Sequence, residues 1–508
     1  MGLGKLLKER AETEKQRNFL YYEGVRYSYN EFFHRVQSLA SGLIELGLAP
    51  GERVALYLGS QPEFIESFYA VIYAGGIVVP LNSHWKAGEL HYILKNSQAK
   101  FLIFSSQLGQ EIRRLELSGL ELKNLIVVGE GELNGWINYQ ELFSKKFFSP
   151  EEESDGQIAS IIYTSGATGK PKGVMLSHKN YLTNLSQLQV VLDTYETDRT
   201  LGILPLFHVL GTMMFLLPIF SGGSLVLFSE FSPRKVLGAL QEFQISVFAG
   251  VPTVYAILSN LPNHRSLSFS KLRYAVCGGA PLSVEVIEQF EKRYGIELLE
   301  GYGLSEATCA CSLNPPAGKR KPGSVGPALP GERIKIMSES ESGLVKELGA
   351  NEVGEILVYG ENVMRGYWRN QTETEQVLKD GWLRTGDLGY YDRDGYYYIK
   401  GRKKDMIIRG GENIYPREVE EVLLTHPGIS EVAVVGIPDR VWGEEVMVFI
   451  VPRDNFEIKT QELADFCHSH LADFKCPKLW QIIKELPKTS AGEVCKQGLL
   501  EKYWSLRK

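Results

Sequence analysis

The stretch Tyr163-Thr-Ser-Gly-Ala-Thr-Gly-Lys-Pro-Lys-Gly173 decides the fold of this chain. It follows the apolar run Ala159-Ser-Ile-Ile-Tyr163, so a buried strand opens into a loop with three hydroxyl residues, three glycines and two lysines. Such a loop exposes backbone N–H groups and hydroxyls that can surround phosphate oxygens, and glycine permits the close backbone approach that this requires. The loop is no Walker A sequence, because no Ser or Thr follows Gly169-Lys170. By itself the pattern indicates either a phosphate-binding loop or a flexible surface turn.

Further motifs follow the loop and together carry a family resemblance. They are Pro205-Leu-Phe-His-Val209, Gly278-Gly-Ala-Pro281, Gly301-Tyr-Gly-Leu-Ser-Glu306, Gly381-Trp-Leu-Arg-Thr-Gly-Asp387, Gly401-Arg-Lys-Lys-Asp405 and Gly410-Gly-Glu-Asn413. In this order, and over nearly the whole chain, they resemble the adenylate-forming superfamily and its AMP-dependent acyl-CoA synthetases. The resemblance implies that a carboxylate attacks the α-phosphorus of ATP to give an acyl-adenylate and pyrophosphate. CoA then displaces AMP, and Mg²⁺ assists the first step.

Composition bounds the class of protein. At 508 residues the chain is too long for one ordinary core, so at least two domains are expected. The net charge is −6, whereas nucleic-acid-binding proteins usually carry a basic surface, so the charge argues against a nucleic-acid binder. The six cysteines lack paired zinc spacing and indicate reduced intracellular thiols. Because the N-terminal segment is charged and lacks the apolar core of a secretory signal, we expect a cytoplasmic protein.

The most apolar stretch, residues 201–228, is interrupted by Pro205, His208 and Pro218. These breaks favour buried core and turns over a membrane span, which needs about 20 uninterrupted apolar residues. Peripheral membrane contact remains open for an enzyme that uses lipids. The sequence does not determine the oligomeric state; a homodimer is one alternative.

Helix and strand signals alternate along the first part of the chain, which predicts an α/β fold with mainly parallel sheets. Ser28-Tyr-Asn-Glu31 is a capping box that opens an amphipathic helix, and residues 54–58, 77–79, 101–104 and 125–128 are predicted strands. The polar segment 332–350 suggests a surface connection. From about Tyr390 short hairpin strands follow, with a turn at Asp392-Arg-Asp-Gly395. We place the boundary after Arg402: a large N-terminal adenylation domain of several subdomains, 1–402, and a small mobile α/β C-terminal domain, 403–508.

The resemblance assigns most of the nucleotide site residue by residue. The phosphate cradle consists of Thr164, Ser165, Gly166, Ala167, Thr168, Gly169 and Lys172. The adenosine and α-phosphate contacts come from Gly278, Gly279, Ala280, Gly301, Tyr302, Gly303, Ser305, Asp387, Ile399 and Arg402. Within this set, Tyr302 offers a face for adenine, and Asp387 offers two acceptor oxygens to the ribose diol. Glu306 is the expected magnesium ligand, because a hard cation prefers carboxylate oxygen.

Other residues are assigned to the acid, the hinge and CoA. His208 is expected beside the route of the carboxylate, and because it supplies no fixed negative charge it favours ordinary carboxylic acids over amino acids. Val251, Gly303 and the surroundings of Cys309 are expected to line the acyl pocket. Lys404 lies where the family has its hinge between two domain orientations. Gly410 and Gly411 would let the pantetheine arm pass close to the backbone.

One position departs from the family pattern. Near the C-terminus the family has Pro-Lys-Thr, two variable residues and Gly-Lys, whereas this chain has Pro487-Lys-Thr-Ser-Ala-Gly-Glu493. The family lysine lowers repulsion between the acyl carboxylate and the α-phosphate, and Glu493 would add a negative charge there. Like charges at about 4 Å cost roughly 1 kcal/mol in water and more in a partly buried site. Glu493 could be an engineered change, a natural variant that relies on Lys488 or Lys496, or a mark of lost ATP-dependent activation.

The sequence therefore predicts an AMP-forming acyl-CoA synthetase, with fatty acids as the leading substrates and benzoate-type or coumarate-type aromatic acids second. Adenylation is expected to be impaired by Glu493. A carrier-protein-loading adenylation enzyme would share every nucleotide motif. A non-catalytic protein that binds nucleotides or acyl ligands is the alternative from a different class.

Overall fold

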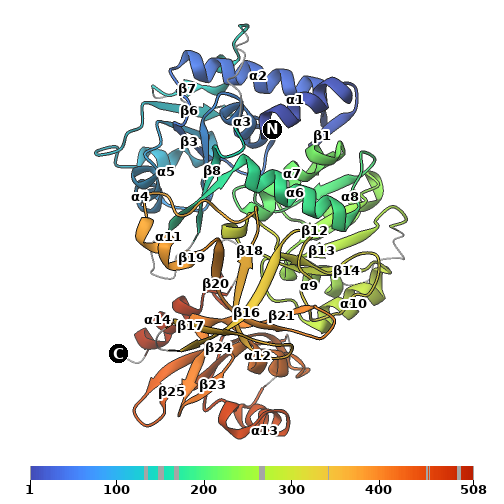
Figure 1. The fold of residues 1–508 in the computed structure, drawn as a ribbon, viewed down its shortest axis with the longest axis vertical. Coiled ribbons are helices and arrows are strands. Elements are labelled where there is room, and N and C mark those ends of the chain that lie inside the picture. The colour runs from blue at the N-terminus through green and yellow to red at the C-terminus, as the bar shows by residue number, and fades with distance from the viewer. Residues whose placement is uncertain are drawn as a thin grey trace.

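The computed structural model describes residues 2–130, 135–146, 154–164, 171–261, 269–340, 343–453, 456, 458–488 and 494–506. It is a mixed α/β protein with a large N-terminal domain and a small C-terminal domain, as predicted. Figure 1 shows the two large sheets in the upper part, a third sheet below them, and the C-terminal domain at the bottom.

A seven-stranded sheet carries the strand that leads to the predicted phosphate loop. Its order is β7-β6-β5-β3-β4-β8-β9, and every pair is parallel except β8 with β9. The strands are β3 (Arg53–Tyr57), β4 (Ile77–Pro80), β5 (Phe101–Ser105), β6 (Asn124–Val128), β7 (Ile137–Asn138), β8 (Ile158–Thr164) and β9 (Lys172–Ser177). The loop thus connects two antiparallel neighbours, with Thr164 opposite Lys172.

An eight-stranded sheet carries the motifs around Gly278 and Tyr302. Its order is β15-β14-β13-β12-β10-β11-β1-β2, parallel except for the two terminal pairs. The strands are β1 (Asn18–Tyr22), β2 (Val25–Ser28), β10 (Arg199–Gly202), β11 (Ser224–Leu227), β12 (Val247–Gly250), β13 (Tyr274–Cys277), β14 (Leu298–Tyr302) and β15 (Ser312–Leu313).

Helices cover both faces of these two sheets, which explains why their strands are continuous apolar runs. One buried core joins the sheets through α1 (Leu3–Thr13), α2 (Tyr29–Glu45), α3 (Pro62–Tyr73), α6 (His178–Leu192) and α7 (Val209–Ser221). The opposite face of the seven-stranded sheet packs on α4 (Ala87–Ser97) and α5 (Gly109–Arg113). The opposite face of the eight-stranded sheet packs on α8 (Pro233–Glu242), α9 (Pro252–Asn260) and α10 (Val284–Tyr294).

The third sheet is antiparallel, with the order β17-β16-β18-β20-β19 and β21 beside β20. The strands are β16 (Arg333–Ser340), β17 (Gly343–Glu347), β18 (Gly354–Tyr359), β19 (Leu378–Lys379), β20 (Trp382–Tyr391) and β21 (Tyr397–Arg402), and α11 (Gln371–Val377) precedes β19. The turn between β20 and β21 is the one predicted at 392–395: Gly395 N–H donates to Asp392 O over 3.0 Å. The prediction of a surface connection at 332–350 was wrong, because β16 lies there and pairs with β18, with Ile336 buried between the sheets and their helices.

The C-terminal domain is a five-stranded sheet with helices on both faces. Its order is β23-β22-β25-β24, with β26 beside β25. The strands are β22 (Ile407–Arg409), β23 (Glu412–Ile414), β24 (Ile429–Asp439), β25 (Gly443–Pro452) and β26 (Leu479–Ile482). The helices α12 (Pro416–Leu424) and α13 (Thr460–His470) pack on one face, and α14 (Lys496–Leu506) packs on the other. Short 3₁₀ turns complete the chain at η1 (Ser106–Leu108), η2 (Tyr139–Leu142), η3 (Ser305–Ala307), η4 (Lys403–Asp405) and η5 (Asp473–Lys475).

The predicted helix start at Ser28 is confirmed. Ser28 Oγ accepts the Glu31 N–H over 3.2 Å, and Glu31 Oε2 accepts the Ser28 N–H over 2.8 Å, so α2 begins with a complete capping box. Within the part of the chain that the structure describes, no helix combines the length and apolar character that a bilayer crossing needs.

A buried histidine ties the N-terminal helix to the core. His178 is 2% exposed, and its Nδ1 accepts the Leu3 N–H over 3.2 Å. Burial lowers the pKa of His178 to about 4, from an ordinary value of 6.5. The folded protein therefore holds this ring neutral, whereas the unfolded chain protonates it below about pH 6.5.

We predict that His178 makes the protein less stable in mild acid. Its contribution is fully present above pH 6.5 and is lost as the pH falls toward 4, for a total of about 3 kcal/mol. Denaturant unfolding from pH 4 to 8 measures the effect. The side chain of the variant His178→Asn does not titrate in this range. As the pH falls from 8 to 4, its free energy of unfolding should therefore decrease less than that of the unaltered protein. Parallel pH profiles for the two proteins would contradict the prediction.

Candidate active site

A cavity of about 2880 Å³ lies between the two domains and takes in the carboxyl ends of three parallel strands. The last residues of β12, β13 and β14 line it: Gly250, Cys277 and Tyr302. The parallel register places these ends together, since Gly250 pairs with Cys277 and Cys277 with Glu300. Ligands in open α/β sheets bind outside the carboxyl ends of the strands, so this is where a site is expected.

The structure brings most of the predicted site residues to this cavity. Those that line it are Thr164, Lys172, His208, Gly278, Gly279, Ala280, Gly301, Tyr302, Gly303, Ser305, Glu306, Asp387, Ile399, Arg402 and Lys404. Ser165, Gly166, Ala167, Thr168, Gly169 and Glu493 lie outside the described residues. Gly410 and Gly411 do not line the cavity; Gly410 N–H donates to Trp442 O over 2.8 Å on another face of the C-terminal domain.

Tyr302 and Asp387 form a hydrogen-bonded pair in the cavity wall. The Tyr302 hydroxyl donates to Asp387 Oδ2 over 2.6 Å, and Arg402 Nε lies 3.9 Å from Asp387 Oδ1. Asp387 is held from its own strand, because its N–H donates to Thr385 Oγ1 over 3.0 Å. Burial and the Asp387 charge raise the pKa of Tyr302 well above its ordinary value, so its hydroxyl stays a donor. The ring therefore stands at a fixed distance from a carboxylate that offers acceptor oxygens to a polar ligand.

Glu306 is carried by a turn with an uncommon backbone. After η3 the chain passes through Thr308 with φ 65° and Cys309 with φ 139°, two successive non-glycine residues with positive φ. Thr308 is fully buried, and its hydroxyl donates to Asn362 O. Gly303 is required beneath this turn, because a Cβ there would lie 1.5 Å from Cys309 O. The surrounding contacts thus hold a strained turn that presents Glu306 to the cavity.

Lys172, Tyr367, Glu306 and Glu373 form a connected cluster in the cavity. The Tyr367 hydroxyl donates to Glu306 Oε1 over 2.9 Å, and the Lys172 ammonium lies 5.4 Å from the centre of the Tyr367 ring. Lys172 also forms an ion pair with Glu373 of α11 and is only 12% exposed. One cation and two carboxylates therefore surround a single buried ring.

The donor set around Glu306 suits magnesium. Its carboxylate faces the cavity with Oε1 already oriented by the Tyr367 hydroxyl, and all its ligand atoms are oxygen, the donor that Mg²⁺ prefers. Mg²⁺ is usually held by one or two carboxylates together with substrate phosphates rather than by a complete protein cage. A single carboxylate in one cluster with the Lys172 ammonium fits that pattern.

His208 begins the apolar arm of the cavity, which we define as the lining residues Leu188, Leu192, Met213, Met214, Leu217, Val247 and Val276. His208 is the N-cap of α7 and packs on the Phe207 ring, with centroids 4.4 Å apart. These residues belong to α6, α7, β12 and β13; Thr200 of β10, the register partner of Val247, and the Phe207 ring line the same cavity. Burial raises the pKa of the neighbouring Cys309 to about 12, so that thiol remains protonated at neutral pH.

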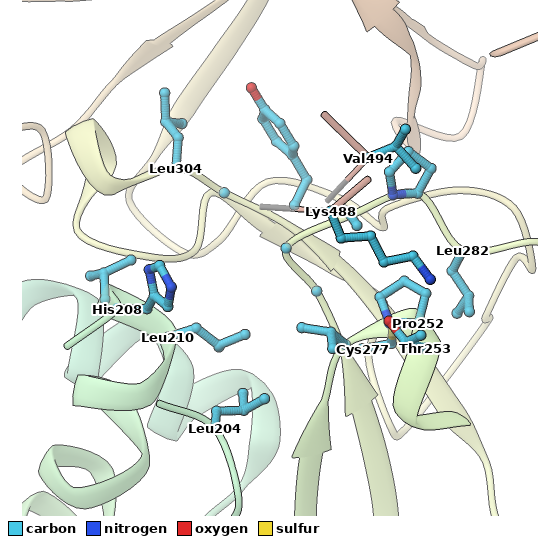
Figure 2. A pocket seen from close by; sticks show the side chains of 18 of the residues that line it. Leu204, His208, Leu210, Pro252, Thr253, Cys277, Leu282, Leu304, Lys488 and Val494 are labelled. Carbon is cyan, nitrogen blue, oxygen red and sulfur yellow. The ribbon is translucent and has the colours of Figure 1, made fainter. Parts of the chain in front are cut away.

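Figure 2 shows how the C-terminal domain closes the cavity. Lys488 and Val494 enter from that domain opposite Pro252 and Cys277, whereas His208 and Leu210 lie on the α7 side. Lys488 Nζ lies 2.7 Å from Glu431 Oε2, and Lys496 Nζ lies 2.9 Å from Glu420 Oε1. Both lysines named as substitutes for the missing family lysine therefore line the cavity, each paired with a glutamate.

Three cavity residues were missed from the sequence. Tyr367 and Glu373 belong to no motif that was recognised, and a single sequence offers no signal that separates them from surface residues. Glu300 directly precedes the Gly301-Tyr302 motif, is 3% exposed and lines the cavity. Burial raises the pKa of Glu300 to about 7, and its Oε2 has no hydrogen-bond partner among the described residues. A glutamate inside an otherwise apolar strand is the signal that could have indicated it.

Comparison with known proteins identifies the family of the chain. The family model described as AMP-binding enzyme matches residues 7–368, and the model of the AMP-binding enzyme C-terminal domain matches residues 418–493. These matches confirm the resemblance inferred from the motifs.

Relatives cover the full length of the chain. A long-chain-fatty-acid–CoA ligase of Bacillus subtilis (strain 168) is 37% identical over 98% of this chain and 94% of its own length. A feruloyl-CoA synthase of an Amycolatopsis species is 36% identical over 97% and 98% of the two chains. The crystal structure of ATP-bound MatB from Rhodopseudomonas palustris superposes with a TM-score of 0.91 at 31% identity, covering both chains completely. The chain therefore belongs to the AMP-binding enzymes of the adenylate-forming superfamily, and it is an AMP-forming acid–CoA ligase.

Proposed function

We propose that this chain activates aliphatic carboxylic acids, and fatty acids above all, and transfers the acyl group to CoA. The observation that carries the proposal is the apolar arm, in which α6, α7, β12 and β13 together contribute seven aliphatic or thioether side chains to the cavity lining. An unbranched acyl chain can bury methylene groups there, each contributing about 0.8 kcal/mol. A substrate of this class matches the printed name of the Bacillus relative, whereas the feruloyl-CoA synthase makes aromatic acids the second candidate.

The nucleotide half of the site supports ATP as the activating substrate. In the proposed first step the acid carboxylate, guided past His208, attacks the α-phosphorus and pyrophosphate leaves. Lys172 would neutralise charge on the phosphates, and the Tyr302–Asp387 pair would hold adenosine at the ribose. Mg²⁺, held at Glu306, would offset charge on the phosphate oxygens. Positioning and charge neutralisation supply much of the rate enhancement in such transfers.

The second step is proposed to use another orientation of the C-terminal domain. The hinge is placed at Lys404, within η4, and the domain boundary at residues 402 and 403. In this structure Lys403 Nζ lies 3.8 Å from Glu355 Oε2, a contact between η4 and β18 that a rotation would have to change. Gly410 and Gly411 do not line the cavity in this structure, and a rotation would bring them to it. The pantetheine arm of CoA could then pass close to their backbone, because neither residue has a side chain.

Glu493 is proposed to slow the first step. It occupies the position at which the family resemblance places a lysine, so it adds repulsion where two anions must meet. Lys488, five positions before Glu493, is one of the two candidate substitutes, and its partner Glu431 is 37% exposed. An ion pair at such a site contributes little, about 0–1 kcal/mol, so Lys488 can leave Glu431 for a more strongly charged partner.

We predict that Glu493→Lys accelerates pyrophosphate release by at least tenfold, since each 1.36 kcal/mol of removed repulsion gives a factor of ten. Pyrophosphate and acyl-CoA are measured from ATP, CoA and a panel of fatty and aromatic acids. The variant Lys488→Met is assayed beside it: if it abolishes adenylation in the unaltered chain, Lys488 performs the family lysine's task. Equal rates for the unaltered chain and Glu493→Lys would show that our account of Glu493 is wrong. Absence of product from every protein would overturn the proposed function.

We predict that bulk in the apolar arm shortens the accepted acid. Leu217 lies nine residues beyond His208 along α7, a distance of about 13 Å at 1.5 Å per residue, and Met213 lies five residues beyond it. Leu217→Trp should lower kcat/KM for long-chain acids by tenfold or more and leave short ones unchanged, while Met213→Trp should also affect medium-length acids.

The control for both variants is Val190→Trp on the exposed side of α6, where the side chain is 66% exposed. Melting temperatures of all variants separate overpacking, which costs about 1–3 kcal/mol, from a change of specificity. A uniform loss for all acids, or a preference for aromatic acids in the unaltered chain, would contradict the assignment of the arm.

A further inference from the structure

Tyr367 is held in place by several backbone contacts, and its hydroxyl contacts the Glu306 carboxylate. The chain around it pairs with β9, the strand that follows the phosphate loop: Trp368 N–H donates to Gly173 O over 2.7 Å, and Met175 N–H donates to Gly366 O over 3.0 Å. Tyr367 itself bridges to Val174, and its N–H donates to Thr374 Oγ1 over 2.9 Å. The residue is 7% exposed. Its hydroxyl is therefore a fixed point in the cavity.

Glu306 depends on that fixed point. Its backbone is anchored, because the Met364 N–H donates to Glu306 O over 2.8 Å, and its side chain extends from a short 3₁₀ turn. The Tyr367 hydroxyl, 2.9 Å from Oε1, determines which way the carboxylate faces. An ionised carboxylate can only accept, so the Tyr367 hydroxyl is the donor of this hydrogen bond.

We propose that Tyr367 is a positioning residue for the magnesium–ATP complex: its hydroxyl holds Glu306 so that the remaining lone pairs of the carboxylate point at the metal. The inference rests on the proposed function, in which Glu306 ligates Mg²⁺. Carboxylates that bind metals are themselves hydrogen-bonded, and loss of such an outer partner typically costs 10–100-fold in metal affinity. The same ring lies beneath the Lys172 ammonium, so one side chain sets the spacing between a phosphate cation and a metal ligand.

The test is calorimetric titration of ATP, without acid or CoA, at saturating Mg²⁺ and in chelator. The ratio of the two ATP dissociation constants reports how strongly Mg²⁺ supports binding. Tyr367→Phe, which keeps the ring and removes only the hydroxyl, should reduce this ratio about tenfold while affinity in chelator stays unchanged. Tyr139→Phe is the matched control, because it removes another hydrogen bond from a buried tyrosine to a carboxylate, that to Glu66 Oε2 at 3.2 Å, and neither residue lines the cavity. Its ratio should equal that of the unaltered protein.

A double variant decides whether Tyr367 acts through Glu306. If it does, Tyr367→Phe added to Glu306→Gln produces no further loss of the Mg²⁺ effect. The inference is overturned by an unchanged ratio in Tyr367→Phe, by a further loss in the double variant, or by an unaltered protein that binds ATP equally with and without Mg²⁺. Acyl-CoA formation is judged in a separate assay, so a protein that shows the predicted Mg²⁺ coupling but forms no thioester would refute the proposed function and uphold the role of Tyr367.

Discussion

The pairing of residues 365–368 with β9 is the contact on which the rest of the site depends. It joins two segments that are almost 200 positions apart in sequence, and it is possible only because residue 173 is glycine: a Cβ there would lie 2.7 Å from Ile161 Cγ2 and 3.3 Å from Trp368 Cβ. Lys172 stands at the start of that strand and Tyr367 in the opposing segment, so the pairing fixes the distance between a cation and an aromatic ring. The carboxylate of Glu306 then completes the group through a single hydrogen bond.

The two halves of the cavity follow different physical rules. On the nucleotide side the groups are polar, partly buried and connected: Tyr302 with Asp387, Tyr367 with Glu306, and Lys172 with Glu373. Such contacts are strong where water is excluded and require defined geometry. The apolar arm relies instead on area and shape, and methionines such as Met213 and Met214 tolerate occupants of varied length. The polar half therefore fixes the geometry of its groups, whereas the apolar arm can be altered by substitution without changing those contacts.

The sequence predicted what depends on local pattern and on recognisable motifs. The capping box at Ser28, the hairpin turn at 392–395 and the convergence of His208, Tyr302 and Asp387 on one cavity needed no structure. Tyr367 was not recognised in the sequence because its position in the cavity arises from tertiary pairing with β9. Such pairing leaves no periodic pattern in the sequence. The polar composition of residues 332–350 was misleading for a related reason: an antiparallel strand with one face toward solvent can be rich in Ser, Glu and Lys and still bury Ile336 on the other face.

The turn at Thr308 and Cys309 lowers the stability of the fold but helps to define the direction of the Glu306 side chain. Each non-glycine residue in such a backbone conformation costs about 1–3 kcal/mol, and neighbouring contacts such as the Thr308–Asn362 hydrogen bond must supply that energy. Glycine at position 309 would relieve backbone strain, yet it would also widen the range of directions open to Glu306. The strained backbone at Thr308 and Cys309 thus limits the directions that the Glu306 carboxylate can take, and a chain without that strain would position it less exactly.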